Sequence, residues 1–268
     1  MTLSIAGKTA IVTGAAKGVG LAIARHFQAK GATVMFADVD EASLLAEVGE
    51  EAKGEGQVRM YAGDLREKLT ITNLLSATLD AFDRVDILVN ASRRIFLSDP
   101  LNPEEDAVEK LWQENVLTSL RLSQLTARRM IQQAEKTGAE GLIGSIINVS
   151  SIAAQGTQPE LLGYSVASAA LDQMTRSMAV ALAPHGIRVN CIAFGSVMSA
   201  SLQASLKDDP QSRAEIVEGT PMGRIAAPDD LVETVQFLAS DAAAFMTGHV
   251  MTVDGGRSLL DRVKVPYY

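Results

Sequence analysis

Several residue types are scarce in this chain of 268 residues, and their scarcity excludes several kinds of protein. Cys191 is the only cysteine, so no disulfide can form within the chain, and its place in an apolar run favours a buried thiol. The three histidines, His26, His185 and His249, lie far apart, and no pair has the spacing of a metal-binding motif. We therefore expect neither a disulfide scaffold nor a metal site.

Positive charge and long apolar runs are also lacking. The net charge of −8 and the absence of a basic cluster with interleaved aromatic residues argue against a nucleic-acid-binding surface. No apolar run reaches the length of a membrane span, and residues 1–4 lack the basic start and apolar body of a signal peptide. We expect a cytoplasmic protein with a small-molecule ligand and no nucleic-acid or membrane partner.

No proline-rich or serine-rich linker divides the chain, and 47% of its residues are hydrophobic, enough for one large core. Short β-branched runs alternate with stretches of helical spacing, which predicts a parallel sheet covered by helices on both faces. We expect one domain over residues 1–268 with about seven strands. The expected strands lie at 9–12, 32–37, 58–62, 85–90, 144–151, 186–193 and near 249–256, and the main expected helices at 41–53, 69–82, 104–133 and 171–183.

The stretch from Thr9 to Asp38 has the order of a nucleotide-binding unit: strand, glycine turn, helix, strand. Gly14 permits a sharp turn, Gly18 a close approach of a pyrophosphate, and Gly20 close packing of the helix on the sheet. Asp38 ends the second strand, 18 residues after Gly20, where a carboxylate can accept both hydroxyls of a ribose and repel a 2′-phosphate. This pattern predicts that NAD is the cofactor.

The spacing Gly-x-x-x-Gly-x-Gly resembles the short-chain dehydrogenase/reductase family, and the likeness extends over nearly the whole chain. The resemblance implies a single-domain Rossmann fold with a doubly wound sheet. Ser151 and Tyr164, 13 residues apart, match its catalytic serine and tyrosine, and Asn115 matches the asparagine that holds a relay water. The cofactor-binding residues that it implies are Gly14, Lys17, Gly18, Val19, Gly20, Asp38, Asp64, Leu65, Asn90 and Val197.

Three departures from the family pattern meet at this site. Arg93 stands where Asn-Asn-Ala-Gly ends in glycine, and Phe194 replaces the proline of Pro-Gly. Ser168 replaces the catalytic lysine, which in the family holds the nicotinamide ribose and lowers the pKa of the tyrosine. Arg93 therefore either crowds the cofactor or directs a cation toward it, and Arg93 or Arg94 could supply the missing charge.

Two functions remain open from the sequence. The first is an NAD-dependent oxidoreductase that acts on a secondary alcohol or ketone, with residues around 195–218 as a flap over the substrate. The second is a non-catalytic homologue, either a partner subunit of an active relative or a nucleotide-binding protein. The resemblance implies a homotetramer, or a hetero-oligomer with an active homologue. Its interfaces would be formed by the helices around 112–131 and 164–183 and by the last strand with the tail 259–268.

Overall fold

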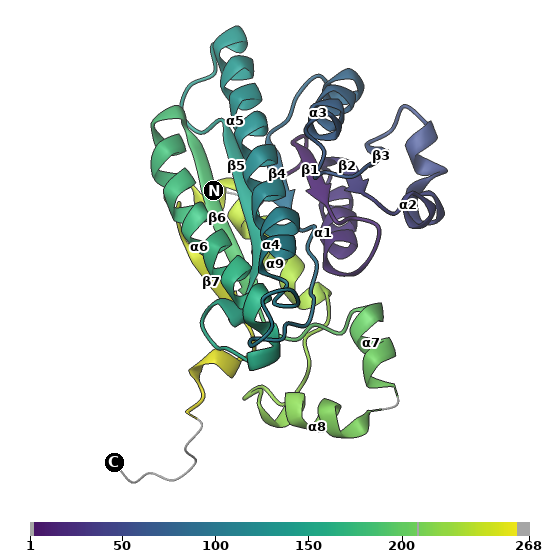
Figure 1. The fold of residues 1–268 in the computed structure, drawn as a ribbon. Coiled ribbons are helices and arrows are strands. Elements are labelled where there is room, and N and C mark those ends of the chain that lie inside the picture. The colour runs from purple at the N-terminus through teal and green to yellow at the C-terminus, as the bar shows by residue number, and fades with distance from the viewer. Residues whose placement is uncertain (1–2, 208, 262–268) are drawn as a thin grey trace.

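The computed structural model describes residues 3–207 and 209–261 and shows a seven-stranded parallel sheet between two layers of helices (Figure 1). The strand order is β3-β2-β1-β4-β5-β6-β7, with every neighbouring pair parallel. The strands are β1 (Thr9–Thr13), β2 (Thr33–Asp38), β3 (Val58–Ala62), β4 (Ile87–Asn90), β5 (Gly144–Ser151), β6 (Ile187–Phe194) and β7 (Val250–Val253). The predicted doubly wound fold is thus confirmed.

The helices connect successive strands, as the alternating pattern predicted. They are α1 (Gly18–Ala29), α2 (Glu41–Val48), α3 (Lys68–Phe82), α4 (Val108–Leu111), α5 (Thr118–Thr137), α6 (Leu162–Leu182), α7 (Ala200–Leu206), α8 (Pro210–Glu218) and α9 (Asp229–Ala239). Helices α1, α2 and α9 contribute to the core on one face of the sheet, and α3, α5 and α6 to the core on the other. Successive residues of a strand alternate between these cores: Val12 packs into the first and Ile11 into the second.

Two expected segments differ in detail from the structure. The single helix expected over 104–133 begins only at Val108 and contains a π-helical turn over Trp112–Leu117, between α4 and α5. The polar segment 195–218, which has little helical periodicity, contains the short helices α7 and α8. Side-chain caps stabilise both starts: Ser199 accepts from the Leu202 N–H, and Asp209 from the Ser212 N–H.

The chain changes direction across the sheet between β1 and β4, and open α/β sheets bind their ligands at the carboxyl ends of the strands at such a point. The turns after these two strands touch. Gly14 has φ of +67°, and a Cβ there would lie 2.9 Å from the Ala91 carbonyl and the Ser92 backbone. The Thr13 hydroxyl joins the turns, accepting from the N–H groups of Ala91 (3.1 Å) and Ser92 (3.0 Å). This contact forms the floor of a crevice.

Candidate functional site

The turn from Thr13 to Gly20 has the geometry of a phosphate-binding turn. A Cβ on Gly20 would collide with the Gly14 carbonyl, so glycine at this position allows α1 to begin directly against the turn. Helix α1 starts at Gly18, and the N–H groups of its first turn carry the positive end of the helix dipole. The predicted residues Lys17, Gly18 and Val19 thus lie at the helix end, where a pyrophosphate would bind.

Asp38 lies at the end of β2 beside this turn, as the sequence predicted. One oxygen of its carboxylate accepts from the Ala16 N–H at 3.0 Å and the other from the Asp40 N–H at 3.0 Å. These two bonds fix the orientation of the carboxylate and leave further lone pairs for ribose hydroxyls. Lys17 Nζ lies 3.5 Å from the Asp40 carboxylate, so the side chain of Lys17 pairs with Asp40.

The predicted adenine-binding residues Asp64 and Leu65 line a small cavity of about 90 Å³ beyond Asp38. Arg66 forms a fork with Asp64 through bonds of 2.9 and 2.6 Å, and the hydrogen bonds from Arg66 hold the pKa of Asp64 below its usual value. This pair occupies one wall of the cavity. Arg93 lines both this cavity and the larger one described next.

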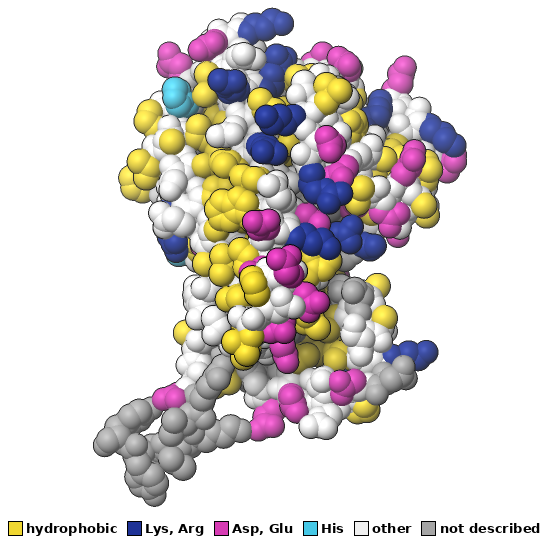
Figure 2. Space-filling model, viewed as in Figure 1, with side chains coloured by type: hydrophobic (Ala, Val, Ile, Leu, Met, Phe, Trp, Pro, Cys, Tyr) yellow, Lys and Arg dark blue, Asp and Glu magenta, His cyan; other side chains and the backbone are white. Residues whose placement is uncertain are grey.

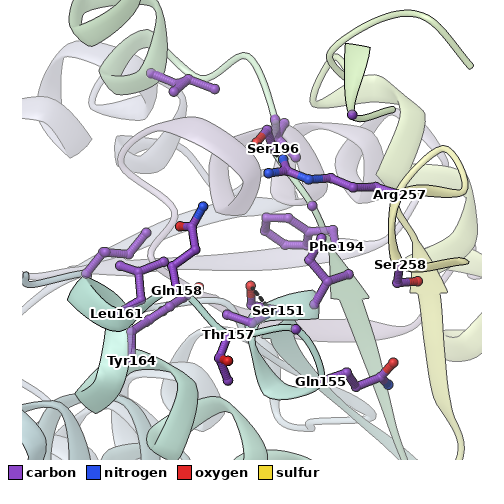
Figure 3. A pocket seen from close by; sticks show the side chains of 18 of the residues that line it. Ser151, Gln155, Thr157, Gln158, Leu161, Tyr164, Phe194, Ser196, Arg257 and Ser258 are labelled. Carbon is purple, nitrogen blue, oxygen red and sulfur yellow. Dashed lines mark hydrogen bonds between the residues drawn. The ribbon is translucent and has the colours of Figure 1, made fainter. Parts of the chain in front are cut away.

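The larger of these two cavities, of about 930 Å³, opens over the carboxyl ends of β5 and β6 and contains Ser151 and Tyr164 (Figure 3). Ser151 ends β5, and its hydroxyl accepts from the Ala153 N–H at 3.1 Å. Tyr164 lies in the first turn of α6, with its side chain pointing into the cavity. Residues of the α7–α8 segment form part of the wall. The 13-residue spacing of the serine and tyrosine therefore brings both hydroxyls to one cavity.

The side chain of Arg93 contacts Tyr164 directly. Its Nη1 donates to the Tyr164 hydroxyl oxygen at 2.6 Å and to the Ser150 carbonyl at 3.2 Å. The guanidinium carbon lies 4.1 Å from the centre of the Phe194 ring, where the face of an aromatic ring attracts a cation. Two departures from the family pattern, Arg93 and Phe194, thus contact each other directly beside Tyr164.

Arg94 points elsewhere. Its Nε lies 3.7 Å from the Glu114 carboxylate, and its side chain lines the small cavity near Asp38. The Asn115 side chain holds the backbone of Arg94 from both sides, accepting from its N–H at 2.8 Å and donating to its carbonyl at 2.9 Å. The predicted catalytic Asn115 therefore clamps the loop that carries Arg93, and its π-helical turn places it opposite that loop.

Ser168 and Asn90 lie inside the protein. Ser168 is buried one helical turn after Tyr164, and its carbonyl accepts from the Ser150 hydroxyl at 3.3 Å. The Asn90 side chain donates to Ser123 at 2.9 Å and to Asn148 at 2.8 Å, so only its backbone can face the crevice. Val197 lies beyond β6 in a bridge with Ala226 and lines the larger cavity.

Below Ser168 lies a buried acid that the sequence reasoning did not single out. Asp172 is one further turn along α6 and is 5% exposed, and the Cys191 thiol lies 3.7 Å from its Oδ1. Burial raises the pKa of Asp172, against hydrogen bonds from Ser150 and Cys191 that lower it. Burial likewise raises the pKa of the Cys191 thiol, which agrees with the inert buried cysteine expected from the sequence.

Arg257 is a second residue of the site that the sequence did not single out. It follows β7, lines the larger cavity, and donates to the Ser196 hydroxyl at 2.9 Å. A signal for it exists in the sequence, because the carboxyl ends of parallel strands meet at one edge of the sheet. A cation just after the last strand therefore belongs to the same edge as Ser151.

The rest of the described surface adds few candidates. Within residues 3–207 and 209–261, no cluster of three or more His, Cys, Asp or Glu side chains could hold a metal ion. None of the described helices is long and apolar enough to cross a membrane. Acidic side chains gather on the face shown in Figure 2. Six acids line a third cavity, formed mostly by the loop that connects β4 to α4 and by α4 itself: Asp99, Glu104, Glu105, Asp106, Glu109 and Glu160.

Comparison with known proteins agrees with this geometry. Residues 14–258 match the family model described as enoyl-(acyl carrier protein) reductase. The chain is 34% identical over 256 residues to L-xylulose reductase of Bos taurus, covering 96% of this chain and 98% of that protein.

Two solved structures show the same fold with different cofactors. The structure of a 7α-hydroxysteroid dehydrogenase with NADH and 7-oxo glycochenodeoxycholic acid has a TM-score of 0.85 at 30% identity, covering 95% of each chain. That of a gluconate 5-dehydrogenase from Burkholderia cenocepacia with NADP and tartrate has a TM-score of 0.86 at 25% identity, covering 97% of this chain and 98% of that one. The chain therefore belongs to the short-chain dehydrogenase/reductase family.

Proposed function

We propose that the protein is an NAD-dependent oxidoreductase that interconverts a secondary alcohol and a ketone, with Arg93 as the cation beside its catalytic tyrosine. The observation that carries this proposal is the 2.6 Å hydrogen bond from Arg93 to the Tyr164 hydroxyl. The family's lysine is replaced by the buried Ser168, yet a cation still contacts the tyrosine. The relatives named above, a sugar reductase and two alcohol dehydrogenases, support the reaction class.

The crevice between β1 and β4 has residues that suit the adenosine and pyrophosphate half of a dinucleotide. The turn at Gly14 and the start of α1 would hold the pyrophosphate, and Asp38 would hold the ribose. A dinucleotide that extends from Asp38 to Tyr164 must pass Arg93, because Arg93 lines the cavities at both ends. The nicotinamide, when bound, accepts or donates the hydride.

Each side chain of the larger cavity then has a defined role. The Ser151 hydroxyl accepts from Ala153, which leaves its proton to donate to the substrate oxygen. The Tyr164 oxygen takes the proton of the alcohol, or returns it to the ketone. The guanidinium of Arg93 stabilises negative charge that develops on the Tyr164 oxygen by direct attraction. Asn115 is a positioning residue, since it holds the backbone next to Arg93.

The test is a set of arginine variants assayed for turnover with NAD and a panel of secondary alcohols. We expect Arg93→Met to lower kcat by roughly 10²–10⁴, the range for positioned acid–base catalysis. Arg93→Lys should retain part of the activity, and Tyr164→Phe should remove it. Arg94→Met is the matched control, because the Arg94 side chain points to Glu114. Equal kcat in wild type and Arg93→Met would refute the role of Arg93.

The choice of NAD over NADP rests on Asp38. Its fixed carboxylate would accept ribose hydroxyls and repel a 2′-phosphate. Lys17, the nearby cation, already pairs with Asp40 and is therefore a weak partner for a phosphate. Calorimetric titration should give tighter binding of NAD(H) than of NADP(H), and equal affinities would show that Lys17 or Arg93 outweighs Asp38.

One observation favours the second candidate, a non-catalytic nucleotide-binding or partner subunit. The guanidinium of Arg93 lies over Phe194 and so fills part of the crevice between the two cavities. In a non-catalytic subunit, this arginine would exclude the nicotinamide half of the cofactor. Arg93→Ala would then bind NAD more tightly than wild type does and would still show no turnover, whereas the proposed enzyme loses turnover in that variant.

A further inference from the structure

We propose that the substrate is a hydroxy acid whose carboxylate is bound by Arg257. This inference builds on the proposed function, because it assigns the chemical class of the molecule whose alcohol meets Ser151 and Tyr164. It is carried by the position of Arg257, whose guanidinium lines the same cavity as those two hydroxyls (Figure 3).

Arg257 is held so that its guanidinium faces the cavity. Its backbone N–H donates to the Asp254 carbonyl at 3.3 Å at the start of a 3₁₀ turn. Its Nη1 donates to the Ser196 hydroxyl at 2.9 Å, which fixes the side chain across the end of β6. The nearest acid in sequence, Asp254, instead accepts from the N–H groups of Gly256 (2.9 Å) and Ser258 (2.6 Å).

The charge of Arg257 has no carboxylate partner in the described part of the chain, since no Asp or Glu oxygen there lies within 4.0 Å of its nitrogens. A half-buried guanidinium with donors to spare is a carboxylate-binding group, because its fork matches the two oxygens. Arg93, the other cation that lines this cavity, is already bonded to Tyr164 and Ser150. Arg257 is therefore the cation available to a substrate.

Three carboxylates also line the cavity, and they bear on where a negatively charged substrate group can bind. Glu215 and Glu218 on α8, and Asp261 beyond Arg257, also line the cavity. Glu215 accepts from Gln211 at 3.1 Å. The acids on α8 repel an anion from that wall, so a substrate carboxylate is directed to Arg257 at the ends of β6 and β7.

The rest of the lining favours a chain that bears hydroxyl groups. Gln155, Thr157 and Gln158 add polar side chains to the lining of the cavity. In Figure 3, Arg257 enters from the side of β7 and Tyr164 from α6, with Ser151 and Phe194 between them. A substrate that contacts both Arg257 and Tyr164 therefore lies across the part of the cavity lined by Ser151 and Phe194.

The experiment measures binding, so that it does not depend on turnover. Wild type saturated with NAD is titrated calorimetrically with three acids of increasing length, lactate, 3-hydroxybutyrate and gluconate, and with their neutral amides. We expect at least one acid, gluconate above all, to bind more tightly than its amide. In Arg257→Gln the ratio of acid affinity to amide affinity should fall by roughly 10- to 100-fold, because a hydrogen bond to a charged group contributes about that much to binding.

Two variants control for indirect effects. Arg257→Lys keeps the charge and should retain part of the preference. Arg213→Gln removes an exposed arginine of α8 that does not line the cavity, so it should leave the acid-to-amide ratio unchanged. If Arg257 only braces Ser196, Arg257→Gln will weaken the acid and the amide alike, and that outcome overturns the proposal. So does a wild type that binds no acid better than its amide.

Turnover on the same samples separates this inference from the proposed function. Acids that bind through Arg257, with no turnover of any acid or of any neutral secondary alcohol, would leave the binding site standing and refute the enzyme. Wild type could instead oxidise neutral alcohols, lose that activity in Tyr164→Phe, and bind each acid no more tightly than its amide. That result would leave the enzyme standing and refute the hydroxy-acid assignment.

Discussion

Under the proposed function, Tyr164 receives its cation from a different part of the chain than the family pattern provides. The family's lysine comes from the same helix, one turn after the tyrosine, where Ser168 now lies buried. Arg93 instead comes from the loop after β4, 71 residues before Tyr164, and approaches the hydroxyl from across the crevice. Ser168 removes one cation from the Tyr164 hydroxyl and Arg93 brings another to it, so we infer that these two departures from the family pattern compensate each other.

This compensation predicts the behaviour of Ser168→Lys. With Arg93 present, a second cation at this hydroxyl adds little, so we expect kcat to change by less than about tenfold. In an Arg93→Gly background, which restores the family's glycine, Ser168→Lys should recover about 10- to 100-fold of the lost activity. The buried Asp172, one turn further on, gives the new ammonium a partner. Steady-state kinetics of the four proteins would check this, and purely additive effects would contradict it.

Asp172 itself predicts a pH dependence of stability. Burial raises its pKa above the usual 3.8, so the folded state favours the neutral acid. Its contribution to stability is complete below pH 3.8 and is lost as the pH rises through the raised value. Asp172→Asn keeps the neutral form at all pH values. Urea unfolding of the variant should therefore show a smaller loss of stability between pH 4 and pH 8 than wild type, and an equal loss would show that Asp172 ionises freely.

At the scale of elements, a charged pair fixes the approach to α9. Arg224 Nη2 donates to Asp230 at 2.8 Å, and Asp230 also accepts from the Ala227 N–H at 2.7 Å. The hydrogen bonds from Arg224 and then from Ala227 lower the pKa of Asp230 to about 2. Because both side chains are partly exposed, solvent screens the pair and it contributes only about 0.5–1 kcal/mol.

Asp230→Asn should therefore lower the free energy of unfolding by roughly that amount at pH 7. A lowered pKa gives a contribution that is present above pH 3.8 and is lost as the pH falls toward 2, so the difference from wild type should vanish in strong acid. Asp229→Asn is the matched control, since Asp229 lies in the same first turn of α9 but not within ion-pair distance of Arg224. Chemical denaturation at several pH values is the measurement, and identical effects of the two variants would argue against the pair.

At the scale of the whole molecule, apolar side chains lie exposed on the faces for which the sequence predicted interfaces. Val180 on α6 is 78% exposed, and Leu259, at the start of the tail, is 86% exposed. The part of the predicted tail interface beyond residue 261 lies outside the described residues. We propose that these faces pair in a homotetramer, with two different two-fold contacts.

Light scattering at micromolar concentration should thus give a tetramer for wild type. Val180→Glu and Leu259→Glu should each yield smaller species, because a buried unpaired charge disfavours an apolar interface. Leu69→Glu is the control, since Leu69 on α3 is 71% exposed but lies outside both predicted faces. A wild-type monomer would refute the proposal, whereas soluble protein only on co-expression with a homologous chain would favour a hetero-oligomer.

The sequence alone determined what depends on local pattern. Short apolar, β-branched runs predicted the seven strands, with β3 and β5 at their observed bounds, because the strands of a parallel sheet covered on both faces are apolar along most of their length. The glycine spacing predicted the turn before α1, because only a residue without Cβ fits against the Gly14 carbonyl. The 13-residue spacing brought Ser151 and Tyr164 to one cavity through β5 and the start of α6.

Only the tertiary structure decided which distant side chains meet. The sequence left Arg93 and Arg94 as equal candidates, and the clamp from Asn115 together with the ring of Phe194 directs Arg93 alone to Tyr164. The cation at Arg257 emerged in the same way, because its role follows from the meeting of β6 and β7 at one sheet edge. Side-chain direction depends on packing between segments far apart in the chain, and no local pattern in a single sequence records it.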